Sequence, residues 1–221
     1  MKVVEIFSSI EGEGIRAGLP VVFVRLFGCN LNCSYCDTKY SREAEEQNAE
    51  VLTVDEIVER VVSYGIPFVT ITGGEPLIHP GIENLLEKLI ELGFGINVET
   101  NGTRTPVYFH DQSVLGRGTI FYTVDYKCPS SGMEDRMHVE LFNGLRSTDV
   151  LKFVVGSEED LLSMLSVLDR LTSEPQIFVS PVFGKIKPEE IVQFIMRHKM
   201  YTCRVQVQLH KIIWSPEKRG V

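Results

Sequence analysis

Short apolar runs rich in β-branched residues alternate along this chain with longer segments whose apolar positions recur at helical spacing. Such alternation is typical of parallel βα units, in which a helix returns the chain to the same edge of the sheet after each strand. The short runs predict strands at residues 21–27, 68–72, 95–99, 120–125, 150–155, 176–179 and 205–209. The longer segments predict helices at residues 53–64, 81–92, 158–171 and 188–198.

The helix boundaries carry recognisable signals. Thr53 followed by Glu56 has the pattern of a capping box, and Gly93 ends the second helix. Five to seven strands with so few helices do not fill an eightfold barrel, which needs about 250 residues. We therefore predict an α/β fold, a shortened, partial (β/α) barrel with mainly parallel strands, formed by residues 1–221 as a single domain.

Composition narrows the class of protein. The 221 residues carry a formal net charge of -8, which argues against extended binding to a nucleic acid duplex. No apolar stretch approaches the roughly 18 to 20 residues that cross a bilayer, so we expect no membrane span. The N-terminal residues lack the pattern of an export signal, which predicts a reducing cytoplasm. The segment 41–50 is rich in Glu and Gln and is expected to form a solvated loop.

Three cysteines, Cys29, Cys33 and Cys36, lie in the spacing CxxxCxxC. Three thiolates at this spacing can hold three irons of a cubane iron–sulfur cluster and leave the fourth iron open to a small-molecule ligand. A structural zinc site needs four ligands, and no second ligand pair or His follows nearby. Disulfides need an oxidising compartment and would leave one of the five cysteines over. We favour a cluster, with zinc as the open alternative.

Further polar groups follow the predicted strands at the edge where such folds collect their working groups. The cysteine loop follows the first strand, and the second ends in Gly73-Gly74-Glu75-Pro76. Glu99-Thr100-Asn101-Gly102 follows the third strand, and Asp125-Tyr126-Lys127 follows the fourth. Paired glycines let the backbone approach a ligand closely, and Glu75 could accept from a ligand ammonium. A plain tight turn is the alternative interpretation of the glycine pair.

CxxxCxxC with Tyr35 before its last cysteine, followed after the next strand by Gly-Gly-Glu-Pro, resembles the radical S-adenosylmethionine (SAM) superfamily. The resemblance implies a 4Fe–4S cluster whose open iron is chelated by the amine and carboxylate of SAM. It also implies cleavage of that cofactor to a 5′-deoxyadenosyl radical. The protein would orient the cofactor and exclude water.

A closer resemblance covers nearly the whole chain. It rests on the segments 9–14, 23–25, 36–38, 127–130 and 208–211 and is to the 7-carboxy-7-deazaguanine synthase family. The resemblance implies a lyase of queuosine and related deazapurine biosynthesis. The implied reaction is the radical ring contraction of 6-carboxy-5,6,7,8-tetrahydropterin to 7-carboxy-7-deazaguanine with loss of ammonia. A shortened barrel and a homodimer are also implied.

Substrate residues follow from this resemblance and, for Arg25, from the residues themselves. Arg25 lies in an otherwise apolar strand, so it needs a partner. The substrate carboxylate is one candidate, bound in bidentate geometry, and an internal Glu is the other. Thr38 matches the hydroxyl that binds Mg²⁺ in this family, and Mg²⁺ favours oxygen ligands. The predicted substrate-binding residues are Ile10, Glu11, Gly12, Glu13, Arg25, Thr72 and His210.

Cofactor residues are assigned from the same family pattern and from the strand ends beside it. The predicted SAM-binding residues are Tyr35, Cys36, Asp37, Gly74, Glu75, Thr100, Asp125, Tyr126 and Lys127. Two positions depart from the family. Many members have Ser-Pro-Lys where this chain has Asp125-Tyr126-Lys127, and relatives commonly carry Gln in place of Glu11. A carboxylate only accepts hydrogen bonds while an amide also donates, so the contacts at these positions must differ.

The chemistry implies a one-electron donor of low potential, which predicts that a flavodoxin or ferredoxin docks near the cysteine loop. Two rival functions stay open at this point. A glycyl-radical activating enzyme is also short and carries CxxxCxxC, but it acts on a protein and needs no pterin pocket. A non-catalytic protein with a structural zinc or cluster is the second rival.

Overall fold

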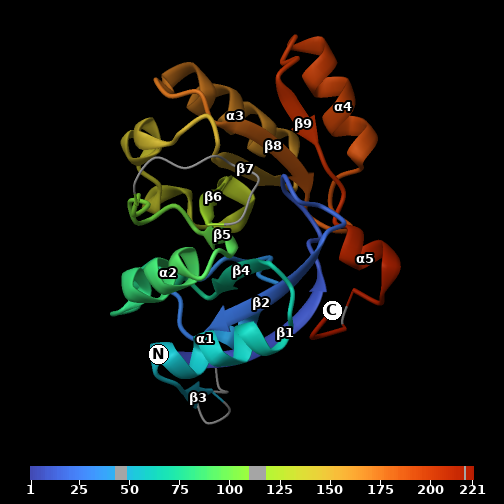
Figure 1. The fold of residues 1–221 in the computed structure, drawn as a ribbon. Helices are drawn as coiled ribbons and strands as arrows, with labels where there is room; N and C mark the ends of the chain where they lie inside the picture. Colours follow the sequence, from blue (N-terminus) through green and yellow to red (C-terminus); the bar gives the residue numbers. More distant parts are fainter. Residues whose placement is uncertain (43–48, 110–117, 217) are drawn as a thin grey trace.

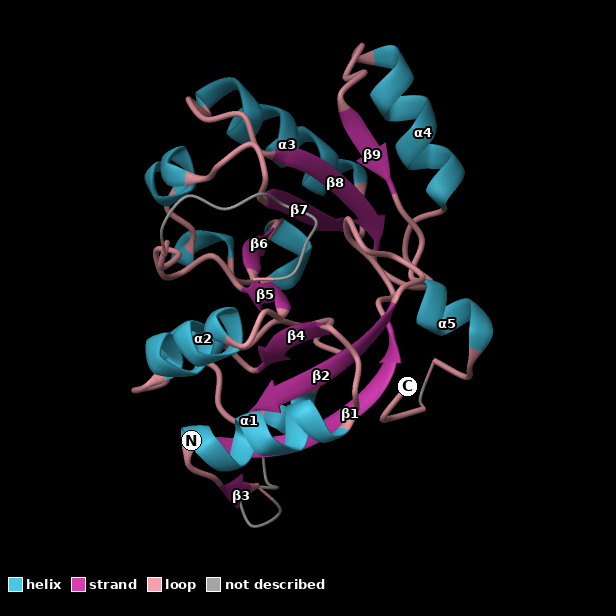
Figure 2. Cartoon of the chain, in the orientation of Figure 1, coloured by secondary structure: helices cyan, strands magenta, loops and turns pink. Residues whose placement is uncertain are grey.

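The computed structural model describes residues 1–42, 49–109, 118–216 and 218–221. Its strands form one sheet in the order β3-β1-β2-β4-β5-β6-β7-β8-β9, shown in Figures 1 and 2. The strands from β2 to β9, β3 excepted, run parallel, while β1 pairs antiparallel with β2 and β3. The strands are β1 Lys2–Ile10, β2 Pro20–Leu26, β3 Glu50–Val51, β4 Phe68–Gly73, β5 Gly95–Thr100, β6 Thr119–Tyr126, β7 Val150–Val155, β8 Gln176–Pro181 and β9 Cys203–Val205.

Helices α1 to α4 lie outside the curved sheet, and α5 lies near the C-terminus beside the end of β1 (Figure 1). The α-helices are α1 Val54–Ser63, α2 Ile82–Glu91, α3 Glu158–Arg170, α4 Pro188–Arg197 and α5 Leu209–Ile213. Short 3-10 helices are η1 Lys39–Ser41, η3 Pro76–Ile78, η4 Pro129–Ser131, η5 Glu134–Arg136 and η6 Val139–Gly144. No helix in the described part of the chain is long and apolar enough to span a bilayer.

The sequence pattern predicts most of these elements and fails near both ends of the chain. β1 is missed because most of its side chains are half-buried, so they give no clear alternation of apolar and polar positions. The strand predicted at 205–209 is wrong: β9 ends at Val205, and α5 begins at Leu209. Of the predicted loop 41–50, residues 43–48 lie outside the described residues, and Glu50 begins β3.

The capping box of α1 is confirmed. The Glu56 amide donates to Thr53 Oγ1 at 3.2 Å, and the Thr53 amide donates to Glu56 Oε2 at 2.7 Å. Together these bonds satisfy two backbone donors that a helix start leaves free. The helix turns Ile57 and Val61 into the apolar core, so the cap orients the helix on the sheet.

The two faces of the sheet differ in chemistry. On β2, Val22, Val24 and Leu26 belong to the apolar core that the helices share, while Phe23 and Arg25 point the other way and line an inner cavity. The inner face also carries Thr72, Glu99, Asp125 and Lys152 from four successive strands. The helix-facing side holds the fold together, and the inner face is left free for chemistry.

The barrel is partial, as predicted, because within the described residues no strand pairing joins β9 to the other end of the sheet. Residues 11–19, which we call the β1–β2 loop, bridge the gap instead. The Gly14 amide donates to Gln206 Oε1 at 2.9 Å, and Gln206 Nε2 donates to the Gly14 carbonyl at 3.1 Å. The Leu209 amide donates to the Gly12 carbonyl at 3.0 Å. Hydrogen bonds from one loop therefore join the first and last parts of the chain.

Candidate active site

A cavity of about 630 Å³ opens at the carboxyl ends of the parallel strands. It is lined by residues from both ends of the chain. The sequence-predicted residues that line it are Ile10, Gly12, Glu13, Arg25, Cys29, Cys33, Tyr35, Cys36, Asp37, Thr38, Thr72, Gly74, Thr100, Asp125, Lys127 and His210. Glu11, Glu75 and Tyr126 do not line it.

The cysteine loop follows β2 and presents Cys29, Cys33 and Cys36 to this cavity. The Leu31 amide and the Asn101 side-chain amide lie 3.5 Å and 3.6 Å from Cys29 Sγ, each as a donor. Hydrogen bonds to cysteine sulfur tune the potential of an iron–sulfur cluster. Asn101 belongs to the strand-end segment that the sequence analysis identified, but no role was predicted for it.

The segment around η4 braces the cysteine loop from outside the cavity. The Ser34 amide donates to the Ser131 carbonyl at 2.9 Å, and Ser34 Oγ donates to the Ser130 carbonyl at 2.6 Å. Inside the loop the Cys36 amide donates to the Cys33 carbonyl at 3.3 Å. These hydrogen bonds join the cysteine loop to the segment around η4.

The arrangement of the thiols fits a cluster better than a single ion. All five cysteines are free thiols, so no disulfide competes for the three in the loop. Among the described residues, no three His, Cys, Asp or Glu side chains converge as ligands of one metal ion. In a cubane each cysteine binds a different iron, so three thiols that face one cavity are the donor set required.

Gly73 and Gly74 let the end of β4 touch the chain that enters the cysteine loop. A Cβ at Gly74 would lie 1.9 Å from the Gly28 carbonyl oxygen, and Gly73 has a φ of 138°. The Gly74 amide donates to the Leu26 carbonyl at 3.0 Å, and the Glu75 amide donates to the Gly28 carbonyl at 2.8 Å. The glycine pair is therefore required by a close approach of two backbones.

The structure does not bring the Glu75 side chain to the cavity. Its carboxylate is fully buried and accepts from the Asn101 amide at 2.6 Å, the Leu77 amide at 2.9 Å and Thr100 Oγ1 at 2.7 Å. Burial raises the pKa of this carboxyl, and the two backbone amides oppose the rise. The predicted contact with a ligand ammonium is therefore corrected: Glu75 joins the turn after β4 to the end of β5.

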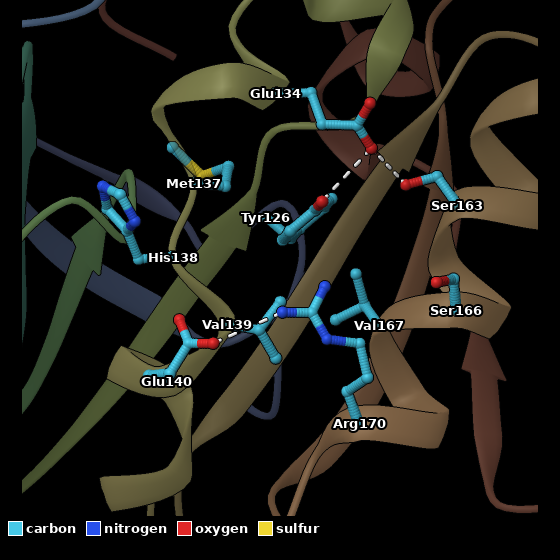
Figure 3. Close-up of a pocket in the computed structure, with 10 residues that line it drawn as sticks. All are labelled: Tyr126, Glu134, Met137, His138, Val139, Glu140, Ser163, Ser166, Val167 and Arg170. Carbon is cyan, nitrogen blue, oxygen red and sulfur yellow. Dashed lines mark hydrogen bonds and ion pairs between the residues drawn. The ribbon is translucent and has the colours of Figure 1, made fainter.

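Tyr126 does not line this cavity but a separate pocket, together with Glu134 and Ser163 (Figure 3). Its hydroxyl donates to Glu134 at 3.2 Å, and Ser163 donates to the same carboxylate oxygen. Its ring packs on Phe142 and Phe153 in the helix-facing core. Adjacent side chains of a strand point to opposite faces, so Asp125 in the cavity places Tyr126 outside it. The predicted cofactor contact of the Tyr126 side chain is corrected on this ground.

Glu11 lies below the cavity in a buried ion pair with Arg16, at 3.1 Å. Thr70 Oγ1 and Asn97 Nδ2 also donate to its carboxylate, and its backbone groups bond to Gly18 and Leu19. Burial raises the pKa of Glu11 and lowers that of Arg16, so either charge would be costly without the other. The predicted pterin contact of the Glu11 side chain is therefore corrected. Pairing with Arg16 explains why this position carries a carboxylate.

Arg25 has the internal partner that was one of its two candidates. Its Nε donates to Glu5 Oε1 at 2.7 Å, and its guanidinium lies 5.9 Å from the centre of the Tyr40 ring. Burial alone would lower the pKa of Arg25, but Tyr40 and Glu5 keep it raised. Among the described residues its Nη atoms have no hydrogen-bond partner. They remain available at the cavity for a planar anion.

Other charged groups link the strands across the cavity. Thr72 Oγ1 donates to Glu99 Oε2 at 2.8 Å. Asp125 lies 2.9 Å from Lys127 Nζ and 3.2 Å from Lys152 Nζ. The sequence analysis placed Glu99 at a strand end without predicting a role for it, and it missed Lys152. A lysine inside the apolar run of β7 carries the same signal that identified Arg25.

Tyr35, Asp37 and Thr38 extend the cavity beyond the cysteines. Tyr35 donates through its hydroxyl to the Val154 carbonyl at 3.2 Å. Burial would raise the pKa of Asp37, but Lys211, whose Nζ lies 3.2 Å from Asp37 Oδ2, lowers it. Thr38 Oγ1 lies 3.7 Å from Cys36 Sγ and faces the same space.

The C-terminal part of the chain covers the cavity. His210, Pro216, Lys218 and the terminal Val221 contribute to its lining. Arg219 lies over the Tyr40 ring, with 4.0 Å between its guanidinium carbon and the ring centre. The segment that follows α5 therefore forms one wall of the site.

Replacing Gly12 with alanine is expected to displace His210 and reduce turnover. A Cβ at Gly12 would lie 2.1 Å from His210 Nδ1, closer than two atoms can approach without a shift. Since α5 is tied to the Gly12 carbonyl, His210 would leave the cavity wall. We expect kcat/KM to fall by about tenfold to a hundredfold, or about 1.4 to 2.7 kcal/mol. The double variant Gly12→Ala/His210→Ala removes the clash, and a further loss in it would contradict this explanation.

Known proteins resemble this chain along its whole length. The family description "Radical SAM superfamily" matches residues 24–113. A 7-carboxy-7-deazaguanine synthase of Clostridium acetobutylicum is 42% identical over 100% of this chain and 99% of its own length. One of Methanospirillum hungatei is 40% identical over 98% of this chain and 86% of its own length. The crystal structure of QueE from Escherichia coli shares the fold, with a TM-score of 0.74, 24% identity and coverage of 94% of this chain and 93% of that one.

Proposed function

Since the chain belongs to the 7-carboxy-7-deazaguanine synthase family of the radical SAM superfamily, we propose that it contracts the ring of 6-carboxy-5,6,7,8-tetrahydropterin with loss of ammonia. The product is 7-carboxy-7-deazaguanine, a precursor in queuosine and related deazapurine biosynthesis. One observation carries the proposal most directly. The three cysteines that suit a cluster and an arginine with free Nη atoms face the same cavity.

Membership of the family implies a 4Fe–4S cluster and SAM. We assign the cluster to Cys29, Cys33 and Cys36. We assign SAM to the adjoining wall that carries Tyr35, Asp125 and Lys127, which we call the cofactor wall. Cys29, Cys33 and Cys36 would hold the cluster, which when bound would supply the electron for radical chemistry with SAM. The chain's own residues fix the position of both ligands, and the C-terminal wall excludes water from them.

Arg25 is the proposed partner of the substrate carboxylate. Its guanidinium is held from behind by Glu5, so its free edge can present two parallel N–H groups. Glu13, Thr72 and His210 line the same space and are the proposed contacts for the pterin ring. Ile10 and the Gly12 backbone complete this side of the cavity, which we call the substrate wall.

Replacing Arg25 with lysine is expected to weaken substrate binding while leaving SAM binding unchanged. Lysine keeps the charge but cannot form the bidentate pair. We expect KM for the pterin to rise about tenfold, or about 1.4 kcal/mol, because one charge-assisted hydrogen bond is lost. Steady-state kinetics and a SAM binding isotherm measure the two effects. An unchanged KM, or an equal loss of SAM affinity, would contradict this role.

We propose that Mg²⁺ binds at Thr38, whose hydroxyl faces the cavity beside the cysteines. Mg²⁺ keeps several waters, so one threonine with substrate oxygens suits it. After exhaustive chelation we expect turnover to fall several-fold and to recover when Mg²⁺ is added. The response to Mg²⁺ should disappear in Thr38→Val. Turnover that changes neither on chelation nor on addition of Mg²⁺ would contradict the assignment of Mg²⁺ to Thr38.

We further propose a flavodoxin or ferredoxin as the reductant, docking near the cysteine loop, and a homodimer as the assembled form. We place the protein in the reducing cytoplasm, which suits its free thiols. A monomeric mass in solution would overturn the dimer.

The function is tested by incubating the anaerobically reconstituted protein with SAM, dithionite and 6-carboxytetrahydropterin. We expect 7-carboxy-7-deazaguanine and ammonia in equal amounts. Deoxyadenosine without 7-carboxy-7-deazaguanine would reject the proposed substrate and favour a radical enzyme that acts on another molecule, such as a glycyl-radical activating enzyme. Zinc in place of iron and sulfide would favour a non-catalytic protein.

A further inference from the structure

Lys152 is a buried cation in the middle of β7 that the proposed mechanism does not use. Its neighbours Leu151 and Phe153 point into the helix-facing core, while Lys152 points into the cavity and is 7% exposed. An ammonium at such depth is stable only beside ionised partners. The position therefore has to be explained by what Lys152 touches.

Its two partners come from opposite sides of the site. Lys152 Nζ lies 3.2 Å from Asp125 Oδ1 and 3.6 Å from Glu13 Oε2. Asp125 is its register partner on β6, whereas Glu13 belongs to the β1–β2 loop. In the described part of the chain, Lys152 is the one cation within 4 Å of both carboxylates. It joins a residue of the cofactor wall to a residue of the substrate wall.

The surrounding charges alternate in sign. Lys127 holds the other oxygen of Asp125, at 2.9 Å. Ser180 Oγ donates to Glu13 Oε1 at 2.6 Å, and Gln208 Nε2 donates to Glu13 Oε2 at 3.2 Å. Burial would lower the pKa of Lys152, but Asp125 and Glu13 raise it. The row Lys127, Asp125, Lys152 and Glu13 is neutral in sum, and each charge depends on its neighbour.

We propose that Lys152 is a positioning residue that couples the two ligand sites, so that SAM and the pterin each strengthen the binding of the other. The inference rests on the proposed function, which places SAM beside Asp125 and the pterin beside Glu13. A ligand hydroxyl that donates to Asp125 weakens its hold on Lys152. The ammonium then interacts more strongly with Glu13 and fixes it for the substrate. Linkage makes the effect equal in both directions.

The test is calorimetric titration of the anaerobically reconstituted, unreduced holoenzyme, in which no turnover occurs. SAM and 6-carboxytetrahydropterin are each titrated alone and then with the other present at saturation. In the wild-type protein we expect each ligand to lower the Kd of the other at least about fivefold. In Lys152→Met we expect both ligands to bind at least about tenfold more weakly alone and the mutual effect to vanish. Lys152→Arg keeps the cation and should restore part of the coupling.

Matched variants separate positioning from other effects. Asp125→Asn should weaken the binding of SAM more than that of the pterin, and Glu13→Gln should weaken the binding of the pterin more than that of SAM. Lys88→Met removes an exposed ammonium that pairs with Asp55 on the helical side. It should change the affinity for neither SAM nor the pterin. A purely structural role of Lys152 would lower the melting temperature and the fraction of competent molecules, while the Kd of those molecules stayed the same.

Three results would overturn the coupling. They are independent binding of the two ligands in the wild-type protein, coupling that survives in Lys152→Met, and weaker binding of only one of the two ligands in Lys152→Met. Wild-type protein that forms product but binds its ligands independently would refute the coupling and leave the function standing. Wild-type protein that binds SAM but not the pterin would reject the function, and the coupling with it.

Discussion

We expect that replacing Cys33 with alanine abolishes product formation and lowers the iron and sulfide content of the reconstituted protein. Cys33 lines the cavity with Cys29 and Cys36, and we assign its sulfur as one of the three protein ligands that the cluster requires. Two remaining thiolates leave two irons without a protein ligand, so the cluster is neither retained nor able to bind SAM in place. We expect no product above background, a larger loss of activity than any substitution in the substrate wall should cause.

Cys203 provides the matched control. It is a free, half-buried thiol at the start of β9 and does not line the cavity. Cys203→Ala should keep wild-type iron content, absorption spectrum and turnover. Iron and sulfide analysis with the visible spectrum would check both variants. Retention of a full cluster in Cys33→Ala, or loss of one in Cys203→Ala, would show that the cluster has other ligands.

Replacing Arg16 with methionine should produce the largest loss of stability. Arg16 is 2% exposed and donates to Glu11, to the Gly95 carbonyl at 2.8 Å and to the Val69 carbonyl at 3.1 Å. Without it the Glu11 carboxylate is buried without a counter-charge. Removing one partner of a buried pair costs about 3 to 5 kcal/mol, so we expect the free energy of unfolding to fall by that amount.

The double variant Glu11→Gln/Arg16→Met tests the cause. It leaves no uncompensated charge, so it should recover about 1 to 3 kcal/mol of the loss. Urea denaturation of the anaerobic protein, followed by circular dichroism, measures all three proteins. A single variant within about 1 kcal/mol of the wild type, or a double variant less stable than the single one, would contradict the ion-pair explanation.

The cysteine site could be proposed from the sequence because its chemistry is local. Cys29, Cys33 and Cys36 belong to one loop, so their spacing alone states how many ligands they offer. The strand ends were also predictable, since parallel strands bring their carboxyl ends to one edge. Arg25 was found because a cation in an apolar strand must have a partner.

The errors arose where a side chain's direction or its distant partners decide its role. Tyr126 follows the inward-facing Asp125, and strand alternation would have placed it outside the cavity. The Glu75 carboxylate accepts hydrogen bonds from backbone amides, and no pattern of side chains in the sequence predicts such bonds. Glu11 and Arg16 meet only because the β1–β2 loop folds beneath the cavity, and Lys152 was overlooked on a strand taken to be simply buried.

The hydrogen bonds between the β1–β2 loop and the segment that follows β9 have a consequence for how the molecule acquires its site. Gly14 and Gln206 are 192 residues apart in sequence, and Glu13 and Gln208 are 195 apart. Contacts of such separation are slow to form, because nearly the whole chain must be ordered before its ends meet. During synthesis the substrate wall can therefore assemble only after α5 has left the ribosome.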